Sequence, residues 1–175
     1  MNVKDKEFEV YISEAKILER TREIATKINE EFKDQDPLFI GILNGSFMFA
    51  ADLMKAVDIP SEITFIKVSS YQATQSTGKV KELVGLQQNI FNRNIILIED
   101  IVDTGRTMEH LITDFKELGP KSISICSLLY KPEALKADLD IRYVGFEIPN
   151  RFVLGYGLDY DGYGRNLRDI YQLKE

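Results

Sequence analysis

The 175-residue sequence has one cysteine, one histidine and no tryptophan. A single cysteine, Cys126, cannot form an intrachain disulfide, and its place in the apolar run 123–129 favours burial as a small hydrophobic residue. A catalytic thiol would need a histidine partner. The one histidine, His110, has Arg106 and Asp114 as its one-turn neighbours in an expected helix, so we interpret it as a surface residue. These absences argue against thiol catalysis.

Long apolar runs are also missing. No stretch reaches the length that spans a membrane, and residues 1–9 mix acids and lysines without the apolar core of a secretion signal. We therefore expect a cytoplasmic protein with no membrane partner. Acidic residues outnumber basic ones, since 22 Lys plus Arg against 28 Asp plus Glu give a net charge of −6. That sign disfavours nucleic acid as the main partner, although it does not exclude a local basic patch.

What is present fits one compact α/β unit. The length lies within the ~100–200 residues of a typical domain, and 44% hydrophobic residues are enough for a substantial core. We expect a single domain over residues 1–175, with no repeat or long linker. Strand patterns alternate with helical ones, which predicts a mostly parallel twisted sheet flanked by helices. Expected helices cover 13–32, 47–57 and 107–118; expected strands cover 38–43, 62–69, 95–98, 122–130 and 142–147.

Two segments do not fit this alternation. Residues 70–80 are polar and carry neither a helical nor an alternating apolar pattern, so we expect a flexible lid loop there. Residues 149–175 are rich in glycine and tyrosine. We expect them to form a small hood, C-terminal with an N-terminal contribution, over one edge of the sheet.

The most informative feature is an apolar run that leads into carboxylates. Residues 95–98 are as apolar as a parallel strand buried on both faces, and ligands bind beyond the carboxyl ends of such strands. Glu99 and Asp100 follow directly and can accept hydrogen bonds from a sugar diol or hold Mg²⁺. Asp103, nearer the next helix, is free for proton transfer. Each acid alone could simply end a strand or cap a helix, but the three together favour a functional role.

The turn that follows has the composition of a phosphate site. Free backbone N–H groups at a helix start attract an anion. Gly105 lets the chain come close to a ligand, while Thr104 and Thr107 add hydroxyl donors. We therefore expect a monophosphate cradle made of Asp103, Thr104, Gly105, Arg106 and Thr107.

Residues 99–107 resemble the signature of the type I phosphoribosyltransferases, which bind 5-phosphoribosyl-1-pyrophosphate. Further segments resemble, in the same order, the hypoxanthine-guanine phosphoribosyltransferases of that family: 43–47, 69–71, 127–131, 144–149 and 152–156. The similarity covers nearly the whole chain. It implies the type I phosphoribosyltransferase fold and a Mg²⁺-dependent purine salvage enzyme, in which hypoxanthine or guanine displaces pyrophosphate to give IMP or GMP. It also implies a homodimer or homotetramer.

The resemblance assigns the ribose, metal and pyrophosphate contacts. Glu99 and Asp100 would serve the ribose and its Mg²⁺, and Asp159 would contact a second Mg²⁺ through water. Pyrophosphate contacts fall to Asn44, Gly45 and Arg165, with Lys67 as a weaker candidate. Relatives usually carry lysine where this chain has Asn44, often after a cis peptide, so a side-chain charge contact is lost but the backbone contacts are not.

The resemblance also assigns the purine site to Lys131, Phe152, Val153, Leu158 and Asp159. Lys131 would donate to the exocyclic oxygen of a 6-oxopurine, which rejects adenine. Phe152 would stack on the ring with Leu158 opposite, and main-chain groups of Val153 and Asp159 would read the far edge. Asp103 would handle the proton at the purine N7. Ser69 and Tyr71 match the family's lid dyad, whose closure would exclude water.

Other functions remain open at this point. RNA-binding pyrimidine-operon attenuators share the signature loop but would show a basic surface, against which the acidic net charge argues. Phosphoribosyl pyrophosphate synthase homologues have a looser loop and lack the Lys131 and Phe152 arrangement. The choice between hypoxanthine, guanine and xanthine depends on backbone positions around Val153 and Asp159, so a xanthine-preferring enzyme is an alternative.

Overall fold

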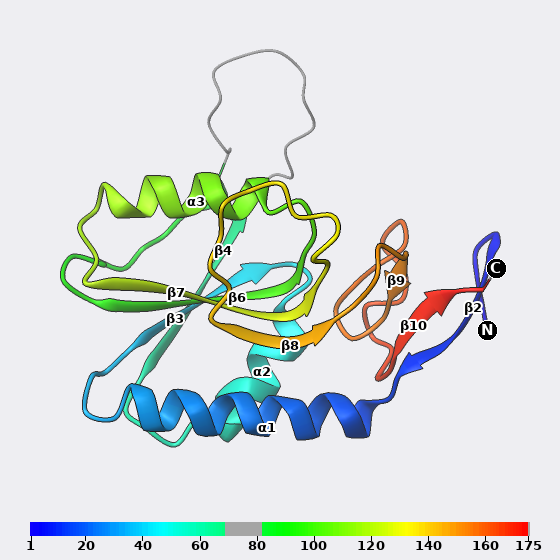
Figure 1. Cartoon of the computed structure of the whole chain (residues 1–175), viewed down its shortest axis with the longest axis horizontal. Helices are drawn as coiled ribbons and strands as arrows, with labels where there is room; N and C mark the ends of the chain where they lie inside the picture. Colours follow the sequence, from blue (N-terminus) through cyan, green and yellow to red (C-terminus); the bar gives the residue numbers. More distant parts are fainter. Residues whose placement is uncertain (69–81, 175) are drawn as a thin grey trace, which may run out of the picture.

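The computed structural model describes residues 1–68 and 82–174, which form a large sheet with helices on both faces and a smaller sheet beside it (Figure 1). The large sheet has the order β5-β4-β3-β6-β7-β8, and every neighbouring pair except β4 and β5 is parallel. Its strands are β3 (Leu38–Leu43), β4 (Glu62–Val68), β5 (Glu82–Val84), β6 (Asn94–Val102), β7 (Ser122–Tyr130) and β8 (Tyr143–Glu147). The prediction of a mostly parallel α/β sheet is confirmed.

Helices cover both faces of this sheet. α1 (Glu14–Glu31) and α2 (Phe47–Ala56) lie on one face, and α3 (Arg106–Lys116) lies on the other (Figure 1). The central strand β6 serves both layers, because Ile96 and Ile98 pack toward α1 and α2 while Ile95 and Leu97 pack toward α3. All four side chains are fully buried. This two-sided burial explains why the run is apolar without alternation.

The second sheet is the hood expected from the C-terminal residues. Its order is β1-β2-β10-β9, with β1 (Asn2–Val3), β2 (Lys6–Ile12), β9 (Val153–Leu154) and β10 (Ile170–Leu173). The expected N-terminal contribution takes the form of strands, which were not predicted: β2 and β10 pair antiparallel and bring the two termini together (Figure 1). The hood therefore contains both ends of the chain and lies beyond the carboxyl ends of the large sheet.

Most element boundaries fall within two residues of the expected ones, but β6 does not. It continues to Val102 instead of ending at residue 98, because its ladder with β7 runs on through Ile101 opposite Leu129. Its ladder with β3 stops at Ile98 opposite Gly41. The last residues of β6 are thus paired on one side only, and the sheet opens between β3 and β6.

Two expectations on location are limited by what the structure describes. The predicted lid, with Ser69 and Tyr71, lies outside the described residues. Within the described residues, no helix combines the length and apolar character needed to cross a membrane.

Cys126 is fully buried, as its apolar surroundings predicted, and this burial raises the pKa of its thiol. His110 lies on α3 and is partly exposed.

Candidate active site

The candidate site is a cavity of about 240 Å³ at the opening between β3 and β6. The strand order runs from β3 toward β4 in one direction and from β6 toward β7 and β8 in the other. Such a change of direction creates a crevice at the carboxyl edge of the sheet, where ligands bind. The cavity is lined by Ile42, Leu43, Val68, Glu99 and residues 101–108. The expected phosphate cradle therefore forms one wall of the cavity, and Glu99 also lines this cavity.

Two adjacent carboxylates stand at the end of β6. The backbone N–H of Asp100 donates to the Glu99 Oε1 at 3.1 Å, and the N–H of Ile101 donates to the Asp100 Oδ1 at 2.8 Å. Burial, and then the negative charge of Asp100, raise the pKa of Glu99 well above its ordinary value. A bound cation would stabilise the ionised form of this pair, and the hydroxyl groups of a sugar would donate hydrogen bonds to it.

The turn after β3 presses against these acids. A Cβ built on Gly45 would lie 1.6 Å from the Asp100 Oδ2, so only glycine allows this approach. On the other side, a Cβ on Gly157 of the hood would lie 2.0 Å from the Gly45 carbonyl oxygen. The peptide between Leu43 and Asn44 is cis, as the resemblance implied. The expected pyrophosphate turn thus lies between the acid pair and the hood.

The phosphate cradle has the expected backbone form. Gly105 precedes α3 with a φ of 77°, a left-handed conformation that favours glycine. The first helical hydrogen bond runs from the Glu109 N–H to the Gly105 carbonyl. The N–H groups of residues 106–108 therefore have no partner one turn earlier in the helix, and they stay available to an anion. α3 begins at Arg106, one residue before the expected start.

The predicted purine lysine and the predicted proton acceptor form an ion pair. The Nζ of Lys131 lies 3.1 Å from the Asp103 Oδ2. Lys131 is 7% exposed, whereas the Asp103 side chain is 49% exposed. Lys131 also donates to the Oδ1 of Asn150 at 3.5 Å, a contact that was not expected. The signal for Asn150 was its place directly after the segment 144–149, which carried the resemblance.

The hood presents an aromatic face beside this pair. The ring of Phe152 is 43% exposed and meets the ring of Tyr160 edge-on at 5.6 Å and 82°. The ring centroids of Phe8, in β2, and Phe152 lie 6.1 Å apart. The Tyr160 hydroxyl donates to the Asp5 Oδ1 at 2.8 Å, and this bond raises the pKa of Tyr160. Tyr160, Phe8 and Asp5 were missed because their contacts with Phe152 exist only after the hood folds.

The remaining predicted side chains of the hood engage one another or are buried. Arg165 Nη2 lies 2.6 Å from the Asp159 Oδ1, and Arg165 Nη1 donates to the Gly157 carbonyl at 2.7 Å. Val153 and Leu158 are buried, with 6% and 8% exposed. Arg165 and Asp159 were expected to serve pyrophosphate and metal separately, but here they neutralise each other.

Lys67 pairs with Leu43 in the β3–β4 ladder, which places the Lys67 backbone beside the cis peptide.

The described residues hold no group of three or more His, Cys, Asp or Glu side chains able to bind a metal ion. A fully protein-held metal centre is therefore not found in that part of the chain. Two neighbouring carboxylates still suit Mg²⁺, which is usually bound by one or two carboxylates, water and substrate phosphates. The adjacent Glu99 and Asp100 carboxylates at the cavity fit such a substrate-completed site.

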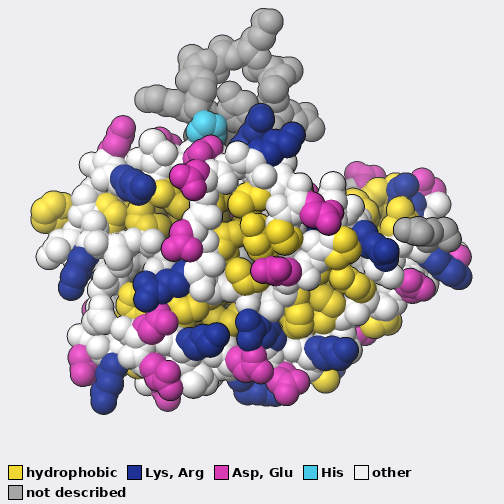
Figure 2. All heavy atoms as spheres, viewed as in Figure 1, with side chains coloured by type: hydrophobic (Ala, Val, Ile, Leu, Met, Phe, Trp, Pro, Cys, Tyr) yellow, Lys and Arg dark blue, Asp and Glu magenta, His cyan; other side chains and the backbone are white. Residues whose placement is uncertain are grey.

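Charge on the visible surface is mixed. Figure 2 shows Lys and Arg side chains interspersed with Asp and Glu side chains on the displayed face. That face offers no continuous basic surface of the kind that an RNA-binding attenuator would use. This agrees with the net charge of −6.

Comparison with known proteins gives consistent matches. The phosphoribosyl transferase domain family matches residues 12–161. The hypoxanthine-guanine phosphoribosyltransferase of Streptococcus mutans is 43% identical over 167 residues, covering 95% of this chain and 93% of that protein. The enzyme of the same name from Bacillus subtilis is 44% identical over 166 residues, covering 94% of this chain and 92% of that protein.

Solved structures give the same result. A Bacillus anthracis hypoxanthine-guanine phosphoribosyltransferase with HEPES in its active site has a TM-score of 0.90 and 40% identity, covering 97% of this chain and 99% of that one. A Trypanosoma cruzi hypoxanthine phosphoribosyltransferase has a TM-score of 0.90 and 34% identity, covering 99% of this chain and 95% of that one.

Proposed function

The chain belongs to the phosphoribosyltransferase family, and we propose that it transfers the 5-phosphoribosyl group from 5-phosphoribosyl-1-pyrophosphate to hypoxanthine and guanine. The observation that carries this proposal is the ion pair between Lys131 and Asp103. Asp103 is the first residue of the phosphate cradle, and Lys131 contacts Asn150 next to the hood. The pair therefore stands where a purine would meet a phosphorylated ribose.

The 5′-phosphate binds the cradle of residues 103–107. Backbone N–H groups at the start of α3 and the hydroxyls of Thr104 and Thr107 donate to its oxygens. The positive end of the α3 dipole adds to this attraction. The cradle fixes one end of the substrate, so the anomeric carbon is held at a defined distance from the purine site.

The ribose hydroxyls lie against Glu99 and Asp100. Magnesium bound there with the substrate would neutralise charge on the departing pyrophosphate. Asp159 is a candidate for a second Mg²⁺, and it would first have to exchange its contact with Arg165. Backbone groups of Asn44 and Gly45 would then bind the pyrophosphate group, together with Arg165. Lys67 is a weaker candidate for the same role.

The purine lies on the exposed face of Phe152 with Leu158 opposite. Lys131 donates to the oxygen at position 6, and main-chain groups of Val153 and Asp159 contact the far edge. The ring nitrogen N9 attacks the anomeric carbon as the bond to pyrophosphate breaks. Asp103 accepts or shares the proton at N7, which keeps electron density on the attacking ring.

The remaining features of the proposal concern the whole protein. Residues 1–175 form one phosphoribosyltransferase domain, with Ser69 and Tyr71 in a lid that excludes water. The protein acts in the cytoplasm as a homodimer or homotetramer.

A base panel tests the proposal. Pyrophosphate release is measured with hypoxanthine, guanine, xanthine, adenine and uracil, each with and without Mg²⁺. The proposal predicts release with hypoxanthine and guanine, dependent on Mg²⁺, and none with adenine or uracil. Release with xanthine alone would replace it by the xanthine-preferring alternative, and an inactive protein that binds RNA in a gel shift would favour an attenuator.

A further inference from the structure

The connection between β7 and β8 runs behind the phosphate cradle. Residues 131–142 contain no helix, and they return across the α3 face of the sheet, where Leu139 and Ile141 pack against the apolar core beneath α3. The connection starts at Lys131, whose backbone N–H donates to the Val102 carbonyl at 3.0 Å. One segment therefore carries the purine lysine and also passes the phosphate site.

Two main-chain hydrogen bonds join this connection to the cradle. The carbonyl of Thr104 accepts from the N–H of Lys136 at 3.0 Å and from the N–H of Ala137 at 3.3 Å. The peptide between Thr104 and Gly105 is trans, so its N–H points opposite to that carbonyl. Fixing the carbonyl on the connection therefore turns the Gly105 N–H away from the connection.

Apolar side chains hold Gly105 from the same side. A Cβ built on Gly105 would lie 2.8 Å from a methyl carbon of Leu135, 2.8 Å from a methyl carbon of Leu139 and 3.2 Å from the Ala137 Cβ. These side chains pack against Gly105 and block its movement toward the connection. None of them lines the substrate cavity.

We infer that Leu139 is a positioning residue for the phosphate cradle: it holds the Gly105 backbone in the orientation that binds the 5′-phosphate. The inference rests on the proposed function, since it presumes that the cradle binds this phosphate. A displacement of about 1 Å at a substrate-positioning group costs on the order of 100-fold in rate. Support from behind the cradle therefore matters although Leu139 never touches the substrate.

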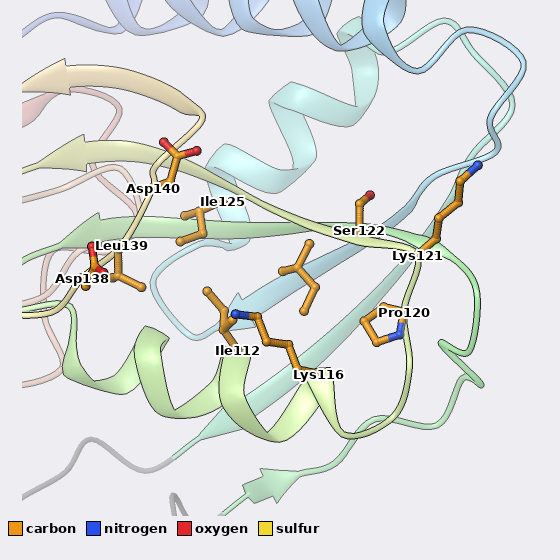
Figure 3. Close-up of a pocket in the computed structure, with 10 residues that line it drawn as sticks. Ile112, Lys116, Pro120, Lys121, Ser122, Ile125, Asp138, Leu139 and Asp140 are labelled. Carbon is orange, nitrogen blue, oxygen red and sulfur yellow. The ribbon is translucent and has the colours of Figure 1, made fainter.

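A second cavity makes Leu139 a suitable residue for the test. It has a volume of about 320 Å³ and lies between α3, the start of β7 and residues 138–140, with Leu139 on its wall (Figure 3). Ile123 also lines this cavity and packs against the same core, but it is not among the atoms closest to Gly105. Both side chains are partly buried and lose three carbons on change to alanine, so they form a matched pair.

The experiment compares Leu139→Ala, Ile123→Ala and Leu139→Met in the full chain. KM for 5-phosphoribosyl-1-pyrophosphate, KM for hypoxanthine, kcat and melting temperature are measured for each variant. We expect Leu139→Ala to raise KM for the phosphorylated substrate about tenfold, within the ~100-fold bound of a 1 Å displacement. KM for hypoxanthine stays within about twofold, because the contacts of Phe152 and Lys131 are unchanged. Leu139→Met should keep the wild-type KM for 5-phosphoribosyl-1-pyrophosphate, and Ile123→Ala should lower only the melting temperature.

The outcomes separate this inference from the proposed function. An unchanged KM for 5-phosphoribosyl-1-pyrophosphate in Leu139→Ala overturns the inference, and so does an equal rise in Ile123→Ala, which would indicate general loosening. If Leu139→Ala does not fold, Leu139→Val gives the same comparison with one carbon removed. A wild-type protein that does not use or bind this substrate would instead refute the proposed function.

Discussion

Lys131→Met is the most selective test of the purine site. The change removes the ammonium and keeps an unbranched side chain of similar length. The Lys131 Nζ contacts the Asp103 Oδ2 at 3.1 Å, and Lys131 is nearly buried. We expect the Nζ to donate to the oxygen at position 6 of a bound purine from this position.

The expected effect follows from the lost hydrogen bond. A hydrogen bond from a charged donor contributes about 1.5–3 kcal/mol, so kcat/KM for hypoxanthine should fall by roughly 10- to 150-fold. Adenine has no oxygen at position 6, so it should stay inactive in the variant as it is in the wild type. Half of the Asp103 side chain stays in water, so the free energy of unfolding should fall by about 1 kcal/mol or less.

Steady-state kinetics with hypoxanthine and adenine, at saturating 5-phosphoribosyl-1-pyrophosphate, measures this effect. Lys121→Met is the control, because Lys121 is exposed and precedes the opposite end of the same strand, β7. The control should keep wild-type kinetics. If Lys131→Met keeps wild-type kcat/KM for hypoxanthine and the same base preference, Lys131 does not contact the purine and the reasoning is refuted.

Three further predictions test the acids and the pyrophosphate turn. Asp103→Asn should lower kcat by on the order of 100-fold or more while calorimetry still detects substrate binding, and wild-type turnover would remove its proton role. Gly45→Ala should abolish activity and lower the melting temperature, because the new Cβ would overlap the Asp100 carboxylate, and wild-type activity in this variant would contradict the close approach. The raised pKa of Glu99 means that its contribution to stability is full below its ordinary pKa of 4.5 and is lost as the pH rises through the raised value. Glu99→Gln should therefore gain melting temperature relative to the wild type as the pH increases, and a constant difference would contradict the shift.

The sheet and the phosphate cradle could be predicted because their signals are local. The apolar run 95–98 is buried on both faces of β6, and α3 begins at Arg106, one residue from the expected start. The end of β6 was placed too early, since the acids after the apolar run looked like the start of a loop. Pairing with β7 alone extends the strand to Val102, and that one-sided pairing cannot be read from β6 itself.

The contacts that complete the site join residues far apart in the chain. Lys131 and Asp103 are 28 residues apart, and Tyr160 reaches Asp5 across 155 residues. The resemblance assigned Lys131 and Asp103 to one purine, but it gave no sign that they pair directly without substrate. The N-terminal strand β2 was missed although Phe8, Val10 and Ile12 alternate along it, because its pairing partner β10 lies at the other end of the chain. Such features follow from the assembly of the hood on the sheet.

The central claim is that residues 103–107 bind the 5′-phosphate of 5-phosphoribosyl-1-pyrophosphate. A crystal structure of the wild-type protein with this substrate and Mg²⁺ tests it most directly. We expect phosphate oxygens within hydrogen-bond distance of the backbone N–H groups at the start of α3, with the ribose hydroxyls against Glu99 and Asp100. A bound substrate whose 5′-phosphate lies elsewhere, with this cradle empty, would contradict the account.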